Sequence, residues 1–279
     1  MLKFTLGHDA EVFLLNEDGV AIPSIGLIGG DKAYPKVIPF GALQEDNVMA
    51  ELNIDPAKSR EEWLHNTNKV REKLELIVGK HGLSVRVVSF QTFQPKFLRS
   101  KQAQMFGCDP DFNIYTGKEN IIDSSTLIKN NHRTAGGHIH IGLENPEQHP
   151  NIRRTLVQAC DVFIGMPLAI VENTGRKAFY GRAGSYRNKE YGIEYRTPSN
   201  IWLTNEEFML WIYEQVIAVV NCVSDLLRGR TSLHQRITEI IGQDRLIDII
   251  NSGDAEESLF QCKEHGIYTP PKDFFLEEW

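Results

Sequence analysis

Residues 136–142 read GGHIHIG, two histidines separated by one isoleucine and bracketed by glycines. Side chains two positions apart on a β-strand point to the same side. We therefore expect His138 and His140 to share one face, with Ile139 and Ile141 against the core. An isolated HxH is more often a solvated strand face than a pair of ligands. The flanking glycines, however, leave room for another group to approach the backbone.

The same alternation recurs in four other segments. Its polar members are Asp9 with Glu11, Glu51 with Asn53 and Asp55, Asp109 with Asp111, and Glu194 with Arg196. If these segments belong to one sheet, helices cover its apolar side and its other side is dense in carboxylates and imidazoles. Crowded carboxylates repel each other unless a cation lies among them. Carboxylate oxygens with an occasional histidine suit Mg²⁺ or Mn²⁺, so the pattern predicts a divalent-metal site.

A basic segment follows at residues 176–196, RKAFYGRAGSYRNKEYGIEYR. Its cations are Arg176, Lys177, Arg182, Arg187, Lys189 and Arg196. Taken alone, the segment is as readily a basic surface loop. Beside a metal-loaded acidic face, the arginines would instead hold phosphate groups. Metal and arginine around phosphate is the arrangement that phosphoryl transfer requires.

Other chemistries with related motifs fit less well. Zinc amidohydrolases carry HxH on the first strand of a barrel, whereas this one is in the middle of a chain without regular βα alternation. Cupins follow HxH with a glutamate, but their glycine spacing and second motif do not appear. The nucleotide-binding loop GxxxxGK[ST] is also absent from the sequence.

The elements that must position these residues can be predicted from the sequence. Asp55-Pro56 predicts the start of a helix that runs to Gly82, with Asp as N-cap and Pro in the first position. Further helices are expected from Pro150 to Val171 with a break at Pro167, from Thr204-Asn205 onward, and over about 231–250. Strands are expected at 9–15, 47–54, 84–91, 109–115, 137–142 and 192–197. This mixture favours an α+β fold with a mostly antiparallel sheet.

Composition narrows the class of protein. The chain has 279 residues and a formal net charge of -7, which argues against a nucleic-acid partner, because a phosphate backbone requires a basic face. The four cysteines, Cys108, Cys160, Cys222 and Cys262, are far apart, and we expect reduced thiols.

We find no signal peptide and no uninterrupted apolar run that would span a bilayer. We therefore expect a cytoplasmic protein, one domain over 1–279 with a helical extension from about 230.

Five segments in this order resemble a known family. They are GHDAEVF, NVMAELNIDP, GCDPDF, GGHIHIG and YGRAGSYRNKEYGIEYRTPSN, between residue 7 and about residue 200. Together they resemble the phage phiEco32-like COOH–NH2 ligases of type 2, relatives of glutamine synthetase and glutamate–cysteine ligase. The resemblance implies a glutamine synthetase-like fold, in which a curved, mostly antiparallel sheet forms a half-barrel. Helices would pack on its convex apolar side.

The resemblance also implies roles for individual residues. The implied metal ligands are Glu11, Glu51, His138 and Glu194, with Glu45 as an additional candidate. The residues implied to bind the nucleotide phosphates are His140, Arg182, Arg187 and Arg196. The implied catalytic residues are Asp9, Glu51 and Arg196, with Glu51 or Asp9 taking the proton of an amine. No role follows for Asp109 or Asp111.

The implied reaction is the ATP-dependent joining of a carboxylate to an amine, with roughly two or three Mg²⁺ or Mn²⁺ ions. The carboxylate would attack the γ-phosphorus of ATP, and the amine would attack the resulting acyl phosphate. Expected partners are small-molecule or peptide carboxylates and amines, and a homo-oligomer is compatible with the family. If the gene belongs to a phage, the protein would act in the host cytoplasm, without a membrane. Two alternatives stay open: a guanidino-kinase-like phosphotransferase, and an inactive relative that binds a peptide or partner.

Overall fold

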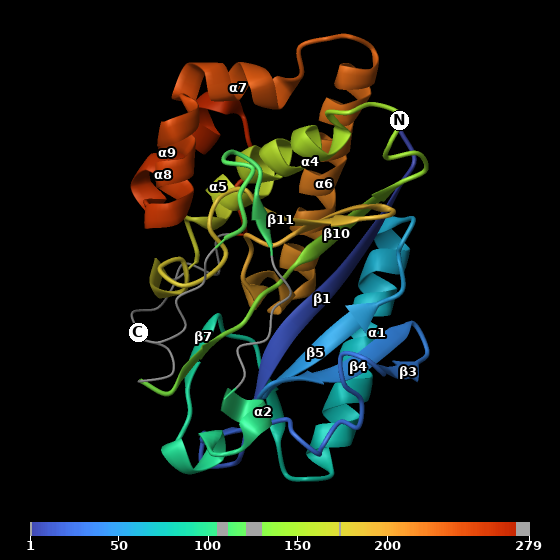
Figure 1. Cartoon of the computed structure of the whole chain (residues 1–279), viewed down its shortest axis with the longest axis vertical. Helices are drawn as coiled ribbons and strands as arrows, with labels where there is room; N and C mark the ends of the chain where they lie inside the picture. The colour runs from blue at the N-terminus through green and yellow to red at the C-terminus, as the bar shows by residue number, and fades with distance from the viewer. Residues whose placement is uncertain (1, 105–110, 121–129, 173, 272–279) are drawn as a thin grey trace.

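A long central strand, β1 (Phe4–Leu15), organises the sheet in this computed structural model (Figure 1). The structure describes residues 2–104, 111–120, 130–172 and 174–271. The other strands are β2 (Ala21–Ile22), β3 (Lys36–Ile38), β4 (Gly41–Asp46), β5 (Met49–Ile54), β6 (Ser84–Arg86), β7 (Phe90–Thr92), β8 (Phe112–Asn113), β9 (His132–Thr134), β10 (Ile139–Leu143), β11 (Ser185–Lys189) and β12 (Gly192–Tyr195). Strand order is β3-β4-β5-β1-β10-β12-β11-β8, and neighbouring strands in this order are antiparallel. β2 and β6 pair with the end of β1, and β7 pairs with β9 in a separate sheet.

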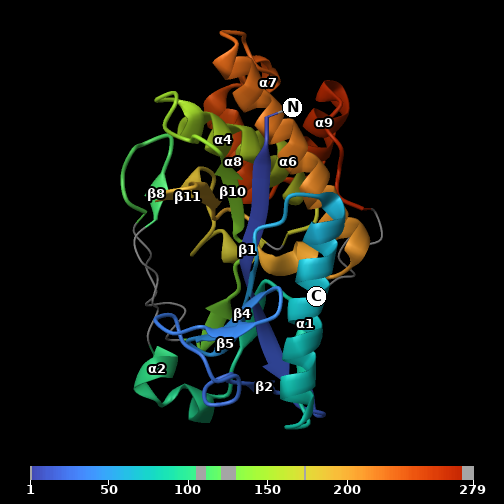
Figure 2. The ribbon, with the colours of Figure 1, turned by 90° about the vertical axis from the view of Figure 1, so that its right-hand side faces the viewer.

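The helices are α1 (Arg60–Gly79), α2 (Lys101–Gln104), α4 (Ile152–Cys160), α5 (Met166–Leu168), α6 (Glu206–Leu227), α7 (Leu233–Ile241), α8 (Gln243–Ser252) and α9 (Ala255–His265). Of these, α1 and α4 contact strands of the sheet directly. Figure 2 shows α1 and α6 on the same side of β1. Alternate residues of β1, such as Ala10 and Val12, are buried in one core with Trp63 of α1 and Val216 of α6. Burial of this apolar face is the main driving force that fixes the sheet against the helices.

The predicted α+β class with a mostly antiparallel sheet is confirmed by this arrangement. The helical character of the C-terminal part is also confirmed, although the helix predicted over about 231–250 is two helices. Gly242 separates α7 from α8 with φ 88°, a left-handed conformation that glycine adopts without strain. The assignment of the whole chain to one domain stays a prediction.

The first helix begins later than the sequence predicted. Asp55-Pro56 is not its start, because Ala57 exchanges two backbone hydrogen bonds of 2.8 Å with Leu6 and keeps the chain extended. The helix starts at Arg60, where the Ser59 hydroxyl accepts a hydrogen bond from the backbone N–H of Glu62 at 3.1 Å. A serine N-cap satisfies an N–H group that has no partner within the helix.

The break predicted at Pro167 begins earlier. α4 passes into a π-helical turn over Asp161–Gly165 before the short α5 that contains Pro167. The buried Asp161 carboxylate accepts hydrogen bonds from Tyr115 Oη at 2.8 Å and Tyr195 Oη at 2.6 Å. Burial raises the pKa of Asp161 to about 6, although both hydroxyls favour its ionised form. The turn thus ties α4 to β12 from the apolar side.

Three predicted strands differ from those observed. The strand predicted at 47–54 is the second half of a hairpin, β4–β5, whose turn contains Asn47 at φ 57°. The strand predicted at 84–91 is divided between β6 and β7, which belong to different sheets. Only Phe112–Asn113 of the strand predicted at 109–115 is extended within the described residues, and residues 109–110 lie outside them.

Helix α6 has the length and hydropathy of a membrane-spanning helix, but 50% of its most apolar window is buried within the protein. It packs against α1 and α4 and carries Glu214 near its middle. We therefore interpret it as the central core helix. The thiols of Cys160, Cys222 and Cys262 are free and buried, as expected, and Cys108 lies outside the described residues.

The glycines before β10 make room for the protein's own chain. A Cβ atom at Gly137 would collide with the backbone oxygen of Ser199 and with the indole nitrogen of Trp202. This indole donates a hydrogen bond to the carbonyl of Gly137 at 3.1 Å. The close approach to the backbone that the flanking glycines predict is therefore present. At Gly137 the approaching groups are Ser199 and Trp202 of the protein itself, which fix the chain next to His138.

We predict that Gly137→Ala lowers the free energy of unfolding by about 1–3 kcal/mol, because the added methyl group overpacks a site closed by backbone. Gly79→Ala is the matched control, since nothing lies within 4 Å of the added Cβ at this last residue of α1. It should be neutral or stabilising. Urea denaturation of both variants measures the difference, and equal stabilities would contradict the packing role of Gly137.

Candidate active site

One face of the sheet carries the predicted polar residues. Strand register pairs Glu11 with Glu51 across β1 and β5, and His140 with Glu194 across β10 and β12. Directly paired residues project to the same side of a sheet. We call the side of the sheet that carries these residues and Asp9 the polar face. The predicted sharing of one face by these strands is confirmed.

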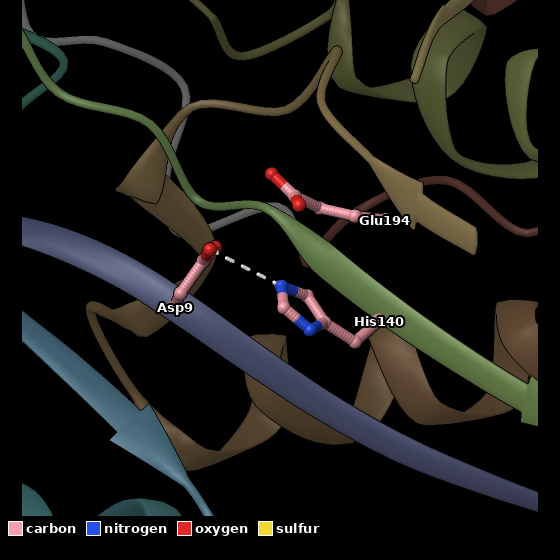
Figure 3. A group of neighbouring side chains, drawn as sticks. All are labelled: Asp9, His140 and Glu194. Carbon is pink, nitrogen blue, oxygen red and sulfur yellow. Dashed lines mark ion pairs between the residues drawn. The ribbon is translucent and has the colours of Figure 1, made fainter. Parts of the chain in front are cut away.

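The first cluster on this face joins three strands. Asp9 of β1, His140 of β10 and Glu194 of β12 each offer a ligand atom, and these atoms lie within 4.8 Å of one another. Figure 3 shows the Asp9 carboxylate facing the His140 ring, with Glu194 beside them. Nε2 of His140 lies 3.2 Å from Oδ2 of Asp9. We call this group the His140 cluster.

A second cluster, the Glu51 cluster, lies on the same face toward the β4–β5 hairpin. Its members are Glu11, Asp46 and Glu51, again with ligand atoms within 4.8 Å of one another. Asp46 was not predicted, and the hairpin turn after it is the sequence signal that could have found it. Glu45, the additional candidate, is directed elsewhere: its carboxylate accepts hydrogen bonds from backbone N–H groups in the loop 26–29.

Burial and crowding disfavour negative charge in the Glu51 cluster. Burial and the nearby carboxylate of Asp46 raise the pKa of Glu11 well above its usual range. Burial and the carboxylates of Asp9, Asp46 and Glu11 do the same to the pKa of Glu51. A cation held between these oxygens would remove the repulsion. The cluster is therefore built of hard oxygen ligands whose ionisation a divalent cation would favour.

Cationic side chains surround the His140 cluster on its other flank. The fully buried Glu194 carboxylate contacts Lys189 Nζ at 2.7 Å, Arg187 Nη1 at 3.3 Å and the guanidinium of Arg196. These residues come from β11 and the end of β12, so the hairpin brings them together. Of the predicted phosphate-binding arginines, Arg187 and Arg196 lie at the cluster. Arg182 is exposed and donates to carbonyls of its own loop.

The two histidines differ in their surroundings. Nδ1 of His138 lies 3.0 Å from Asp9 Oδ1, and its Nε2 lies 3.0 Å from the Tyr180 hydroxyl. Burial and the charge of Arg196 lower the pKa of His138 to about 3, so the ring is neutral. With both nitrogens engaged, His138 orients Asp9 in this geometry. It is His140 that joins the carboxylates in a cluster, and the metal role of His138 stays a prediction.

Two tyrosines of the site were not predicted from the sequence. The Tyr180 hydroxyl contacts both His138 and the guanidinium of Arg196. The Tyr191 ring stacks on His140 at a centroid distance of 6.0 Å, and its hydroxyl lies 2.7 Å from His140 Nδ1. Such a partner on one ring nitrogen fixes the tautomer and orientation of a ligand histidine. Both tyrosines lie in the basic segment at residues 176–196, of which only the cationic residues were predicted to bind a ligand.

Part of the basic segment is structural rather than exposed. Buried Arg176 donates to the carbonyls of Thr197 and Pro198 at 2.9 and 3.0 Å. Buried Lys177 forms an ion pair with Glu172 at 3.0 Å. The interpretation as a surface loop is therefore wrong for these two residues. They hold the loop against the strand end at residues 197–198 and so position Tyr180.

Asp111 lies beside Arg196, with Oδ2 3.5 Å from Nε of the guanidinium. The residue is 4% exposed, and its Oδ1 has no hydrogen-bond partner within the described part of the chain. Asp109, predicted to share a face with it, lies outside the described residues.

In metal-free buffer, we predict that Glu51→Gln stabilises the protein at pH 8, because burial and the carboxylates of Asp9, Asp46 and Glu11 raise the pKa of Glu51 and make its ionisation unfavourable in the folded state. The folded protein holds the Glu51 proton above pH 4.5, where the unfolded chain has lost it. Stability conferred by this group therefore falls as the pH rises, and glutamine removes that fall.

Urea denaturation in a chelator at a series of pH values measures this difference. Glu239→Gln, at an exposed carboxylate on α7, is the control and should leave the pH dependence unchanged. A Glu51→Gln protein that is less stable than the wild type at pH 8, or equally pH-dependent, would contradict the crowding of this cluster.

One comparison with known protein families agrees with the motif resemblance. Residues 126–239 match the family model of the phage phiEco32-like COOH–NH2 ligases, type 2. No curated protein matches the chain. The chain aligns with a crystal structure of a novel glutamine synthase homolog at 14% identity and a TM-score of 0.43, over 95% of this chain and 66% of that one. It aligns with ligand-free apo GmaS at 12% identity and a TM-score of 0.39, over 95% of this chain and 70% of that one. The match over residues 126–239 agrees with the family predicted from the motifs, the phage phiEco32-like COOH–NH2 ligases of type 2, and covers less than half of the chain.

Proposed function

We propose that the protein is an ATP- and Mg²⁺-dependent ligase that joins a carboxylate to an amine through an acyl phosphate. The observation that carries the proposal is the pair of clusters on the polar face, with three cationic side chains gathered on Glu194. Hard oxygen ligands on one flank and guanidinium groups on the other suit a transferring phosphoryl group. The family match supports the joining of a carboxylate to an amine.

The residues present fit divalent metal ions. The His140 cluster offers two carboxylates and one imidazole, and the Glu51 cluster offers three carboxylates. These are ligands that Mg²⁺ and Mn²⁺ accept, and because burial and neighbouring carboxylates raise the pKa values of Glu11 and Glu51, a bound cation would favour their ionised forms. Bound metal would neutralise charge on the phosphate oxygens during transfer.

The reaction would begin when a substrate carboxylate oxygen attacks the γ-phosphorus of ATP. The bond to the β-phosphate oxygen breaks, and an acyl phosphate and ADP form. An amine nitrogen then attacks the acyl carbon, and phosphate leaves with the former carboxylate oxygen. In both steps Arg187, Lys189 and Arg196 would offset negative charge on the phosphoryl oxygens. Tyr180, through Arg196 and His138, would hold these groups in place.

The substrates we propose are small-molecule or peptide carboxylates and amines, and the product is an amide or isopeptide bond. Because ATP is required, we propose that the protein acts in the cytoplasm, which is that of the host if the gene is carried by a phage. A homo-oligomer is compatible with the proposal. Nucleic acid and membrane are not required by it.

We predict that metal and nucleotide bind together. A non-hydrolysable ATP analogue at about a hundred times its Kd should add roughly 2.7 kcal/mol of stability, and only in the presence of Mg²⁺ or Mn²⁺. Thermal unfolding measures this. Glu51→Gln should reduce the metal-dependent gain, whereas Glu239→Gln should keep it. A gain with metal alone would favour a metallohydrolase, and no gain with either ligand would favour an inactive binding protein.

We also predict transfer of oxygen from the carboxylate to phosphate. A panel of ¹⁸O-labelled α-amino and dicarboxylic acids is incubated with Mg·ATP and an amine, and the released phosphate is analysed by mass spectrometry. Each turnover should place one labelled oxygen in phosphate, because the acyl C–O bond breaks in the second step. A stable phosphorylated product without free phosphate would instead favour the guanidino-kinase-like alternative.

A further inference from the structure

A cavity of about 400 Å³ lies beside the end of β1, and the proposed reaction does not use it. Its walls come from four parts of the sequence: the turn after β1, residues 86–92, residues 171–172, and the start of the 3₁₀ turn that Ser199 caps. The described residues that line it include no member of the His140 cluster or of the Glu51 cluster. Sites for small molecules usually have volumes of about 300–1,000 Å³. The cavity is therefore large enough for a small organic molecule.

The buried wall of this cavity contains Glu172 and Ser199. Oε1 of Glu172 accepts a hydrogen bond from the backbone N–H of Ser199 at 2.6 Å, and its Oε2 forms an ion pair of 3.0 Å with Lys177 Nζ. Ser199 also forms an antiparallel bridge with Gly136, two residues before His138. The charge of this wall is therefore paired within the protein, and the wall separates the cavity from the chain that leads into β10.

Apolar side chains form another part of the wall. They are Leu15, Val88, Val171 and Ile201. Val171 is buried, whereas the other three are partly exposed. A ligand with an apolar body would remove more of this surface from water, and its affinity should increase with the apolar area that it buries.

Arg86, at the end of β6, gives the cavity a positive charge. Among the described residues that line the cavity, Arg86 and Glu172 are the charged ones, and Glu172 is paired with Lys177. The charge complementary to the cavity is therefore negative. A guanidinium group binds a carboxylate through charge-assisted hydrogen bonds. Gln91 and Thr92 also line the cavity, and their amide and hydroxyl groups are further donors.

We propose that this cavity is a binding site for a small carboxylic acid with an apolar body. The carboxylate binds at Arg86, and the body packs against Val88, Val171 and Ile201. This ligand is distinct from the acid and the amine that the proposed ligase would join, because it binds outside the polar face. It also contacts Ser199, which supports the chain before β10.

Isothermal titration with butyrate, hexanoate and 3-phenylpropionate, in a chelator and without nucleotide, tests this proposal. The wild-type protein should bind 3-phenylpropionate, and it should bind the neutral 3-phenylpropionamide about tenfold more weakly, because the amide loses the charge-assisted hydrogen bond. Arg86→Met should weaken binding of the acid about tenfold and leave binding of the amide unchanged. Arg228→Met is the matched control, since this exposed arginine at the end of α6 is not among the residues that line the cavity.

Two further variants fill the cavity from different walls. Val88→Phe and Ile201→Phe each place a ring in it and should abolish saturable binding of the acid, while circular dichroism shows which of them are folded. Equal affinity for the acid and the amide, binding that survives in a folded phenylalanine variant, or no saturable binding of any of the acids by the wild-type protein would overturn the proposal. The titrations contain neither metal nor ATP, so their failure leaves the proposed ligase function untouched.

Discussion

Repulsion between buried carboxylates is the constraint on which the rest of this structure depends. Strand alternation directs Asp9, Glu11, Glu51 and Glu194 to one face, because the alternate residues of these strands are buried in the apolar core with the helices. At Glu194 the protein itself offsets the charge with three cationic side chains. Burial still raises the pKa of Glu194, and in the Glu51 cluster burial and neighbouring carboxylates raise the pKa values of Glu11 and Glu51. Both clusters thus contain buried carboxylates whose ionisation a bound cation would favour.

Rigid packing behind the polar face maintains this arrangement. The indole of Trp202 and the backbone of Ser199 close on Gly137, which fixes the chain one residue before His138. Arg176 and Lys177 secure the neighbouring loop from within. Burying these cations is costly unless each is paired or hydrogen-bonded, and each has such partners here. The result is that Tyr180 and Arg196 meet His138 without depending on a flexible surface loop.

Strand alternation made much of the site predictable. Because residues i and i+2 share a face, the sequence placed Asp9, Glu11, Glu51 and Glu194 together without knowledge of strand order. Asp46 was not predicted because the strand expected at 47–54 included Asn47, which in the structure belongs to the turn between β4 and β5. The roles of Arg176 and Lys177 depend on tertiary burial, which a run of basic residues does not reveal. Asp55-Pro56 carried good local signals for a helix start, but backbone pairing between Ala57 and Leu6 overrode them.

The central claim is that the polar face holds divalent metal at both clusters, and anomalous diffraction from crystals grown with Mn²⁺ and an ATP analogue tests it most directly. The account predicts one anomalous peak among Asp9, His140 and Glu194, and another among Glu11, Asp46 and Glu51. Coordination distances near those of oxygen-ligated Mn²⁺ would identify the ligands. Crystals that contain the nucleotide but show no peak at either cluster, or peaks only elsewhere on the protein, would contradict the account.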